Sequence, residues 1–241
     1  MSICTICQTD ASESFVRKDG YEYLRCPDCG FVFLDPMPEP ESLSRIYNED
    51  EEGVSVAGYP KAASRMRRAT VKALKLWPYY VGRDAIDVGC GGGFIVAAMH
   101  RFGARATGLD ISRESIEYAK QRFPRDDFVN ESFEDFLLQG RVFGFLYSSE
   151  VIEHIGDVHG YMRFLAGVAA PGARLYLTTP DVEHPTVPDD PAQWNMVSPP
   201  RHVQLFNEVS LRRLFADYGF EIQKRYLKNA PTLQVLARKL S

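Results

Sequence analysis

The sequence has no long apolar run, no large excess of one charge and few cysteines, and each absence excludes a class of protein. Its 241 residues carry a formal net charge of −4, with 45% hydrophobic and 25% charged residues. So small a charge gives no general attraction to nucleic acid. No apolar run is long enough to cross a bilayer. We therefore expect a soluble globular protein with one large domain and a small appendage.

The amino-terminal residues lack the basic segment and apolar stretch of a signal peptide. We see no internal repeat and no low-complexity segment. We therefore expect a cytoplasmic protein, in which the five cysteines are reduced thiols or metal ligands rather than disulfides.

Four of the cysteines form two C-x-x-C pairs, Cys4 with Cys7 and Cys26 with Cys29. Two such pairs supply a tetrahedral zinc site, and a hairpin about residues 18–20 fits between them. Four thiolates leave no open coordination position, so we expect a structural zinc ribbon. A redox C-x-x-C would need a βαβ context, which this segment lacks.

A glycine-rich run follows a short apolar strand and precedes a helical pattern. Gly89, Gly91 and Gly93 let the backbone turn sharply and approach a ligand. A dinucleotide fingerprint would need a third glycine where Phe94 stands. Asp87 would also repel a diphosphate, whereas it would attract the ammonium and sulfonium groups of S-adenosylmethionine (SAM).

A second acid, Asp110, ends the next predicted strand. An acid at this place in a doubly wound sheet binds a ribose diol, and Ile111 would then lie against adenine. The alternative is a tight turn with a chance surface aspartate.

The motifs DVGCGGG, GLDIS, EVIEHI, PGARLYLTTP and RHVQLF together resemble class I SAM-dependent methyltransferases. The resemblance covers about two thirds of the chain. It is closest to the group that includes ubiquinone-biosynthesis O-methyltransferases and many antibiotic and sugar methyltransferases. It implies an α/β fold, a doubly wound seven-stranded Rossmann-like sheet, with one antiparallel strand at the carboxyl end. It also implies that the loop after the third strand binds the adenine edge. The predicted cofactor-binding residues are Asp87, Gly89, Cys90, Gly91, Asp110, Ile111, Ser132, Phe133 and Ser148.

The alternation of period-two and helical patterns divides the chain into 1–34 (zinc ribbon), 35–82 (linker and helical lid) and 83–241 (SAM-binding domain). We also expect a short helix over 41–47 and an acidic loop over 48–53. Strands are predicted over 85–88, 106–109, 127–129, 143–147, 174–178, 220–226 and 232–237, and helices over 94–102, 112–122, 132–138, 158–169 and 208–218.

A further helix is predicted from Pro60 to Trp77, ending before Pro78. One face of it is basic. This face is either a clamp for a phosphate, carboxylate or nucleotide, or a solvated face paired with the acidic loop, and we favour the second interpretation. In related enzymes such a helix covers the cofactor, which makes Tyr59 and Arg65 candidate pocket residues. The basic residues are Lys61, Arg65, Arg68, Lys72 and Lys75.

Glu150, Glu153 and His154 follow the fourth strand, and in a helix all three would face one way. With His202 they resemble the Glu-x-x-Glu-His and distal histidine of small-RNA 2′-O-methyltransferases, where the four side chains bind a divalent ion. This implies magnesium, manganese or a similar ion. Two alternatives stay open: a histidine acts as general base without metal, or the cluster is structural.

The segment 181–200 is long and rich in proline, and we expect it to form a lid over the substrate. Trp194 and Phe206 would supply an apolar wall, or would only pin the segment to the body.

The function predicted from these features is biosynthetic methyl transfer from SAM to a sugar or secondary metabolite, with oxygen favoured as the acceptor atom. One alternative is an RNA methyltransferase that uses the ribbon and the basic helix. The ribbon has only Arg17, Lys18 and Arg25 as basic residues, which argues against nucleic acid. A second alternative, a non-catalytic SAM-binding protein, has no need of both acids. The acceptor and the oligomeric state stay open.

Overall fold

The computed structural model describes residues 2–11, 13–39, 42 and 59–240. The helix predicted over 41–47, apart from Ser42, and the acidic loop over 48–53 lie outside the described residues. Within the part of the chain that is described, no helix is both long enough and apolar enough to span a membrane.

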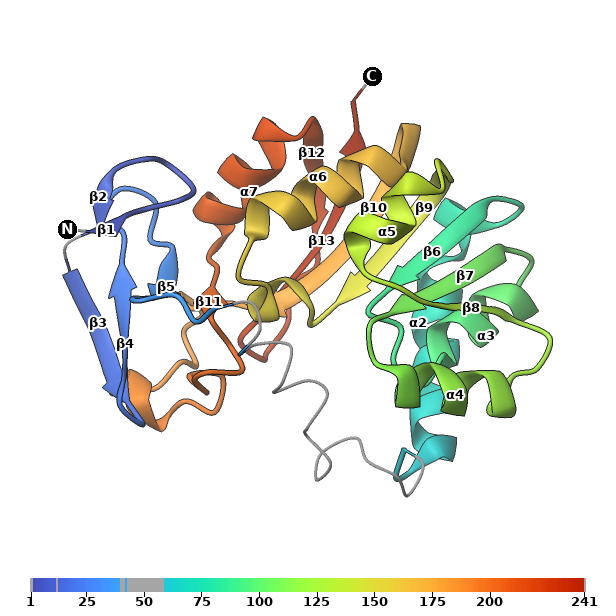
Figure 1. Cartoon of the computed structure of the whole chain (residues 1–241), viewed down its shortest axis with the longest axis horizontal. Coiled ribbons are helices and arrows are strands. Elements are labelled where there is room, and N and C mark those ends of the chain that lie inside the picture. The colour runs from blue at the N-terminus through green and yellow to red at the C-terminus, as the bar shows by residue number, and fades with distance from the viewer. Residues whose placement is uncertain (1, 12, 40–41, 43–58, 241) are drawn as a thin grey trace.

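A seven-stranded sheet forms the centre of the molecule, in the order β12-β13-β10-β9-β6-β7-β8 (Figure 1). Only β13 runs antiparallel to its neighbours. The predicted doubly wound sheet is therefore confirmed, and its strand order reverses beside β6. The strands are β6 (Asp84–Val88), β7 (Arg105–Asp110), β8 (Asp127–Asn130), β9 (Phe143–Ser149), β10 (Ala169–Pro180), β12 (Phe220–Arg225) and β13 (Thr232–Lys239).

Helices cover both faces of this sheet. Successive residues of a strand point to opposite faces, and in the central strands both sets are apolar. Ala85 packs with α2, α3 and α4, whereas Ile86 packs in the core that α5, α6 and α7 share. The helices are α2 (Ala62–Tyr80), α3 (Phe94–Arg101), α4 (Arg113–Arg122), α5 (Phe133–Leu138), α6 (Val158–Val168) and α7 (Glu208–Asp217).

Two predicted boundaries are wrong, and proline is involved in both. Helix α2 continues through Pro78, because a proline in the last turn removes only one hydrogen bond and the Val81 amide still donates to the Trp77 carbonyl at 3.1 Å. Strand β10 begins at Ala169 and contains Pro171. Its register against β9 shifts there, so the missing amide does not interrupt a regular ladder.

The amino-terminal segment forms the predicted hairpin of β3 (Glu13–Lys18) and β4 (Tyr21–Arg25), shown in blue in Figure 1. Two further strands complete its sheet in the order β11-β5-β4-β3. β5 (Val32–Leu34) follows directly, but β11 (Gln204–Leu205) comes from just before α7. The ribbon sheet is thus completed by a distant part of the chain. A separate pair, β1 (Ser2–Ile3) and β2 (Asp10–Ala11), lies beside the cysteines.

The segment 181–203 packs against the ribbon sheet. Trp194 is 3% exposed and lies in an apolar cluster with Tyr23 and Leu34. Phe206 is fully buried, with its ring 5.1 Å from that of Phe31. These contacts favour the second interpretation of the two aromatic residues: they pin the segment to the body and do not form an open wall.

Candidate active site

The turn between β6 and α3 has a backbone that requires glycine. Gly89, Gly91 and Gly93 have φ values of 73°, 48° and 76°, in the left-handed region. A Cβ atom on Gly93 would lie 2.5 Å from the Phe128 ring. Sterics therefore explain why the sequence places bare backbone here, beside the carboxyl end of β6.

Asp87 lies just before this turn and is 3% exposed. Burial, and then the nearby Asp110 carboxylate, raises its pKa to about 8. A carboxyl group in this environment is stabilised in its charged form by a cation. The site is thus suited to a positively charged ligand.

Asp110 ends β7 and is held by backbone amides on both sides. Its Oδ2 accepts from Gly91 N and its Oδ1 from Ser112 N, each at 2.8 Å. Each carboxylate oxygen has a second lone pair for another donor, such as a hydroxyl. Ile111 beside it is 54% exposed, so an apolar surface is available next to the acid.

Tyr59 lies across the glycine turn, where a lid residue was predicted. Its ring would be 2.8 Å from a Cβ atom on Gly92, and its hydroxyl donates to Ser115 Oγ at 2.9 Å. The guanidinium carbon of Arg65 lies 5.3 Å from the ring centroid. Tyr59 is therefore a neighbour of the turn, and Arg65 lies against Tyr59.

The other predicted cofactor residues are more enclosed. Cys90 is buried, and burial raises the pKa of its thiol. The Ser148 hydroxyl shares a 2.6 Å hydrogen bond with Tyr161. Ser132 caps α5, and the Phe133 ring stacks on Phe164 at 4.8 Å. One face of the Phe133 ring is therefore covered by the core. Phe133 is less accessible to a ligand than Ile111.

Glu153, His154 and His202 come together at the carboxyl ends of β9 and β10. One ligand atom from each lies within 4.8 Å of the other two. Glu153 is fully buried. Its Oε2 accepts from Thr179 Oγ1 at 3.0 Å, and its Oε1 has no hydrogen-bond partner in the described structure. Burial, and then Glu150, raises its pKa. An unmatched buried oxygen beside two imidazoles fits the donor set of a divalent ion.

Both histidines have a defined tautomer. Nδ1 of His154 lies 2.9 Å from the Arg201 carbonyl, and Nδ1 of His202 lies 2.7 Å from the Met196 carbonyl. A carbonyl only accepts, so each Nδ1 donates and each Nε2 carries the lone pair. Burial lowers the pKa of His154 to about 4 and also lowers that of His202. Both rings are neutral at pH 7, as a base or a metal ligand requires.

Glu150 is not part of this three-residue cluster. The segment forms a 3-10 helix only over Ile152–His154, and Glu150 precedes it with a left-handed φ of 57°. Its Oε1 accepts from Thr178 Oγ1 at 2.8 Å. The condition under which Glu150, Glu153 and His154 would share one helical face is therefore not met, because the chain turns sharply at Glu150, where an α-helix would have to begin.

Sequence reasoning missed the residues that hold the cluster in place. The Gln204 side-chain amide donates to the carbonyls of Ile152 and Ile155, each at 2.7 Å. The Tyr23 hydroxyl donates to the His202 carbonyl at 2.5 Å. RHVQLF contains Gln204, but nothing in the sequence indicates that Tyr23 reaches this loop.

The four amino-terminal cysteines form a second cluster, whose sulfur atoms all lie within 4.8 Å of one another. Cys4 and Cys29 are 3.7 Å apart, and Cys7 and Cys26 are 3.3 Å apart. Tetrahedral zinc with bonds of about 2.3 Å would place its sulfur ligands ~3.8 Å apart. None of the five cysteines forms a disulfide. The cluster therefore fits a four-thiolate zinc ion.

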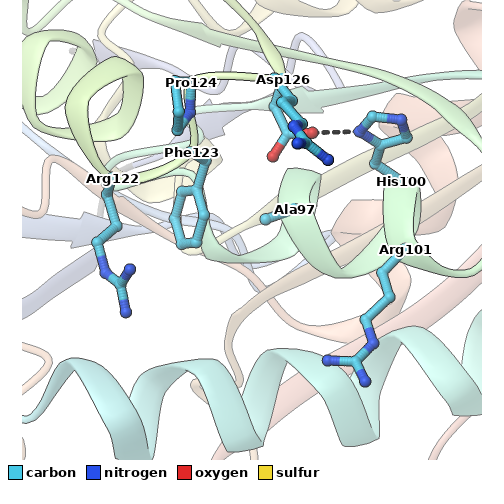
Figure 2. Close-up of a pocket in the computed structure, with 8 residues that line it drawn as sticks. Ala97, His100, Arg101, Arg122, Phe123, Pro124 and Asp126 are labelled. Carbon is cyan, nitrogen blue, oxygen red and sulfur yellow. Dashed lines mark hydrogen bonds and ion pairs between the residues drawn. The ribbon is translucent and has the colours of Figure 1, made fainter.

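A hollow of about 450 Å³ lies elsewhere, where α3 and α4 end (Figure 2). Arg101, Arg122 and Arg125 line it, and His100 pairs with Asp126. Carboxyl ends of helices in such a sheet lie at the edge opposite the carboxyl ends of the strands. No predicted site residue lines this hollow.

Comparison with known proteins agrees with this geometry. The family model of the methyltransferase domain matches residues 61–225. The chain therefore belongs to the methyltransferase-domain family. A ubiquinone biosynthesis O-methyltransferase of Methylobacterium sp. (strain 4-46) is 30% identical over 102 residues, which are 41% of this chain and 41% of that protein. The chain thus spans about two fifths of the length of this curated relative.

Two solved structures share the fold. The magnesium protoporphyrin IX methyltransferase of Synechocystis PCC 6803, with bound S-adenosylhomocysteine, has a TM-score of 0.61 at 17% identity, over 83% of this chain and 99% of that one. The 1,6-didemethyltoxoflavin-N1-methyltransferase of Burkholderia thailandensis, also with S-adenosylhomocysteine, has a TM-score of 0.61 at 17% identity. It covers 95% of this chain and all of its own. The class I SAM-dependent methyltransferase fold expected from the motifs is therefore confirmed.

Proposed function

We propose that the protein transfers a methyl group from SAM to a hydroxyl of a small-molecule acceptor, a sugar or secondary metabolite. The observation that carries this proposal is the buried Asp87 beside a glycine turn and a second acid, Asp110. The two structural relatives with bound S-adenosylhomocysteine support the cofactor. The O-methyltransferase relative supports oxygen as the acceptor atom.

The residues around the glycine turn have distinct roles in this scheme. Asp87 offsets the positive charge of the cofactor, and Asp110 accepts hydrogen bonds from its ribose hydroxyls. Ile111 contacts the adenine, and Tyr59 with Arg65 covers the glycines. When bound, SAM would supply the methyl group for the acceptor oxygen, whose proton would pass to a nearby base. The chain itself has to align the two reactants and exclude bulk water.

Calorimetry with SAM and S-adenosylhomocysteine tests the cofactor assignment. We expect Asp87→Asn to weaken SAM binding by about 10- to 100-fold, since a charge-assisted interaction is worth roughly 1.5–3 kcal/mol. Asp84→Asn is the matched control, because Asp84 lies on the same strand but is half exposed and paired with Arg105. Absence of binding heat for the unaltered protein would refute the proposed function.

We further infer that Glu153, His154 and His202 hold a divalent ion beside the acceptor. The carboxyl oxygen without a partner and the two neutral imidazoles fit such an ion. When bound, the ion would lower the pKa of the acceptor hydroxyl. The carbonyls of Arg201 and Met196 keep each imidazole in the tautomer that presents Nε2.

Metal analysis separates this inference from the general-base alternative. The purified protein should contain manganese or magnesium in addition to the zinc of the cysteine cluster, and Glu153→Gln should lose the manganese or magnesium. His100→Asn, at the opposite edge, should retain it. A protein that binds neither ion but loses turnover in His202→Ala would instead assign His202 as a general base.

We also propose that Cys4, Cys7, Cys26 and Cys29 hold a structural zinc ion, and that the chain is organised as 1–34, 35–82 and 83–241. The four sulfur atoms are close enough for one ion. No position would remain for a reacting ligand, so the ion would have a structural role only.

A further inference from the structure

Four lysines gather beside the candidate active site, and we call them the lysine cluster: Lys72, Lys75, Lys224 and Lys228. Lys72 Nζ lies 3.4 Å from the Tyr176 hydroxyl and 5.2 Å from its ring centroid. Lys75 and Lys224 lie 4.0 Å and 4.8 Å from the ring centroid of Tyr226. The cluster thus joins α2, β12 and the loop after β12.

No acid of the described residues lies in direct contact with a charged group of the lysine cluster, although Glu150 is near enough to act on Lys72. Among the residues that the structure describes, none of the four lysines forms an ion pair. Burial, and then the charges of Lys228 and Lys75, lowers the pKa of Lys72, while Glu150 acts in the opposite direction. Like charges held this close destabilise one another unless an anion lies between them.

The position of the cluster connects it to the methyl-transfer site. Tyr147 pairs with Asp87 across β6 and β9, and its ring stacks on Tyr176 at 5.4 Å. Tyr176 also contacts Tyr226. A row of three tyrosine rings therefore runs from the proposed cofactor acid to the lysine cluster. All three lie on the sheet face that α2 covers.

We propose that the lysine cluster binds a phosphate or diphosphate group of the methyl acceptor. This inference rests on the proposed function and narrows its substrate class to phosphorylated compounds. The acceptor would place its reacting hydroxyl near Glu153 and its phosphate among the lysines, and the buried rings of Tyr147 and Tyr176 would support this surface from beneath. The basic helix face, considered from sequence as a solvated surface, thus has two members in the site, Lys72 and Lys75.

The chemistry favours phosphate over a single carboxylate. A carboxylate carries one charge and is matched by the planar fork of arginine, which is absent from the cluster. A phosphate carries up to two charges and has oxygens directed to several sides, so ammonium groups from separate segments can surround it. The Tyr176 hydroxyl accepts from Lys72 Nζ at 3.4 Å and donates to Gln234 Oε1 at 3.1 Å, which positions the Lys72 ammonium group.

Titration with inorganic pyrophosphate and inorganic phosphate, followed by calorimetry and phosphorus NMR, tests the inference on the full-length protein. We expect saturable binding that weakens as salt is raised. Lys72→Met keeps the apolar stem and should weaken binding about tenfold, and Lys228→Gln, an exposed position, should weaken it severalfold. Lys120→Gln on α4 is the matched exposed control and should bind normally. Tighter binding of pyrophosphate than of phosphate would assign a diphosphate, and the reverse a monophosphate.

Two results would overturn the inference: no saturable binding of either anion, or binding that is lost in Arg122→Gln and kept in Lys72→Met, which would place the anion in the arginine-lined hollow of Figure 2. S-adenosylhomocysteine is titrated into the same samples. Normal affinity for it together with absent anion binding would refute the lysine site while leaving the proposed cofactor function intact.

Discussion

At the scale of single residues, Asp87 makes the protein sensitive to pH. Its pKa is raised from an ordinary value of 3.8 to about 8. Between these two values the unfolded chain has released the proton and the folded one has not. The free energy of unfolding of the cofactor-free protein therefore falls as pH rises from about 4 to about 8.

Binding of SAM should show the opposite trend. A cation stabilises the ionised carboxylate, so binding releases a proton and affinity rises up to tenfold per pH unit below the pKa. We expect this between about pH 5.5 and 7, where the amino group of SAM stays charged. Calorimetry in buffers of different ionisation enthalpy measures the proton release. Asp87→Asn should remove it, and an affinity independent of pH in the unaltered protein would contradict the assignment.

Two glycines with the same backbone angle separate strain from crowding. Gly93 has φ 76° and its Cβ would lie 2.5 Å from Phe128, whereas Gly172 has φ 75° with nothing within 4 Å. Gly172→Ala should lower the free energy of unfolding by about 1 kcal/mol. Gly93→Ala should lower the free energy of unfolding by roughly 1–3 kcal/mol more than this, because its Cβ would also clash with Phe128. Denaturant unfolding of both variants checks this, and equal losses would show that Phe128 moves aside freely.

The positions of the two acids in the fold were predictable from the sequence. Asp87 and Asp110 stand near strand ends, and the glycines indicate the turn between β6 and α3. Glu150 was not predictable, because its left-handed backbone is unusual for a glutamate and only the surrounding fold imposes it.

At the scale of elements, the ribbon contacts both α6 and the loop that carries His202. His159 Nε2 donates to the Thr5 carbonyl at 2.8 Å, beside the first C-x-x-C pair, and Tyr23 donates to the His202 carbonyl. Loss of the ion should therefore loosen both contacts.

We expect one zinc ion per chain by colorimetric titration after denaturation. Cys29→Ser should lose the ion and unfold at a lower temperature, because metal binding contributes directly to folding of such small modules. Cys90→Ser is the control, since Cys90 is buried near the glycine turn and should leave the zinc content unchanged. Zinc retained in Cys29→Ser would argue against a four-cysteine site.

Most long elements followed from their periodicity and caps. Ser112, Ser132 and Asn207 each accept a hydrogen bond from the third residue of their helix. Strands β5 and β11 were not predicted, since two or three residues carry no periodicity and their pairing joins distant segments.

At the scale of the whole molecule, the ribbon and the large sheet share one apolar core. Cys29 and Phe31 pack in the same cluster as Phe206 and Leu211. We therefore expect one cooperative unfolding transition in the zinc-bound protein rather than two.

The two tryptophans of the chain report on this directly. Trp194 is buried against the ribbon sheet, and Trp77 lies on α2 with its indole donating to the Phe102 carbonyl at 3.1 Å. Fluorescence of Trp77→Phe and Trp194→Phe should give denaturation curves with the same midpoint, once each is corrected for the stability of its variant. A Trp194 signal that changes first would show that the ribbon unfolds independently. The same two curves are measured on protein from which a chelator has removed the zinc, for comparison with the zinc-bound protein.

The arrangement of the whole was only partly open to prediction. The sequence patterns were sufficient for the layered sheet, because alternation of strand and helix has few solutions. They were not sufficient for the lysine cluster, in which residues of α2 meet residues of β12 and its following loop across the fold.

The two-residue strand β11 has a consequence for evolution and engineering. The ribbon sheet includes β11, which belongs to the segment that carries His202. The ribbon and this segment therefore cannot be exchanged separately. A chimaera that receives a foreign ribbon would lose the β5 partner of Gln204–Leu205, so that β11 would be unpaired and the nearby His202 displaced. Recombination that preserves activity must therefore transfer both pieces together, although they are far apart in the chain.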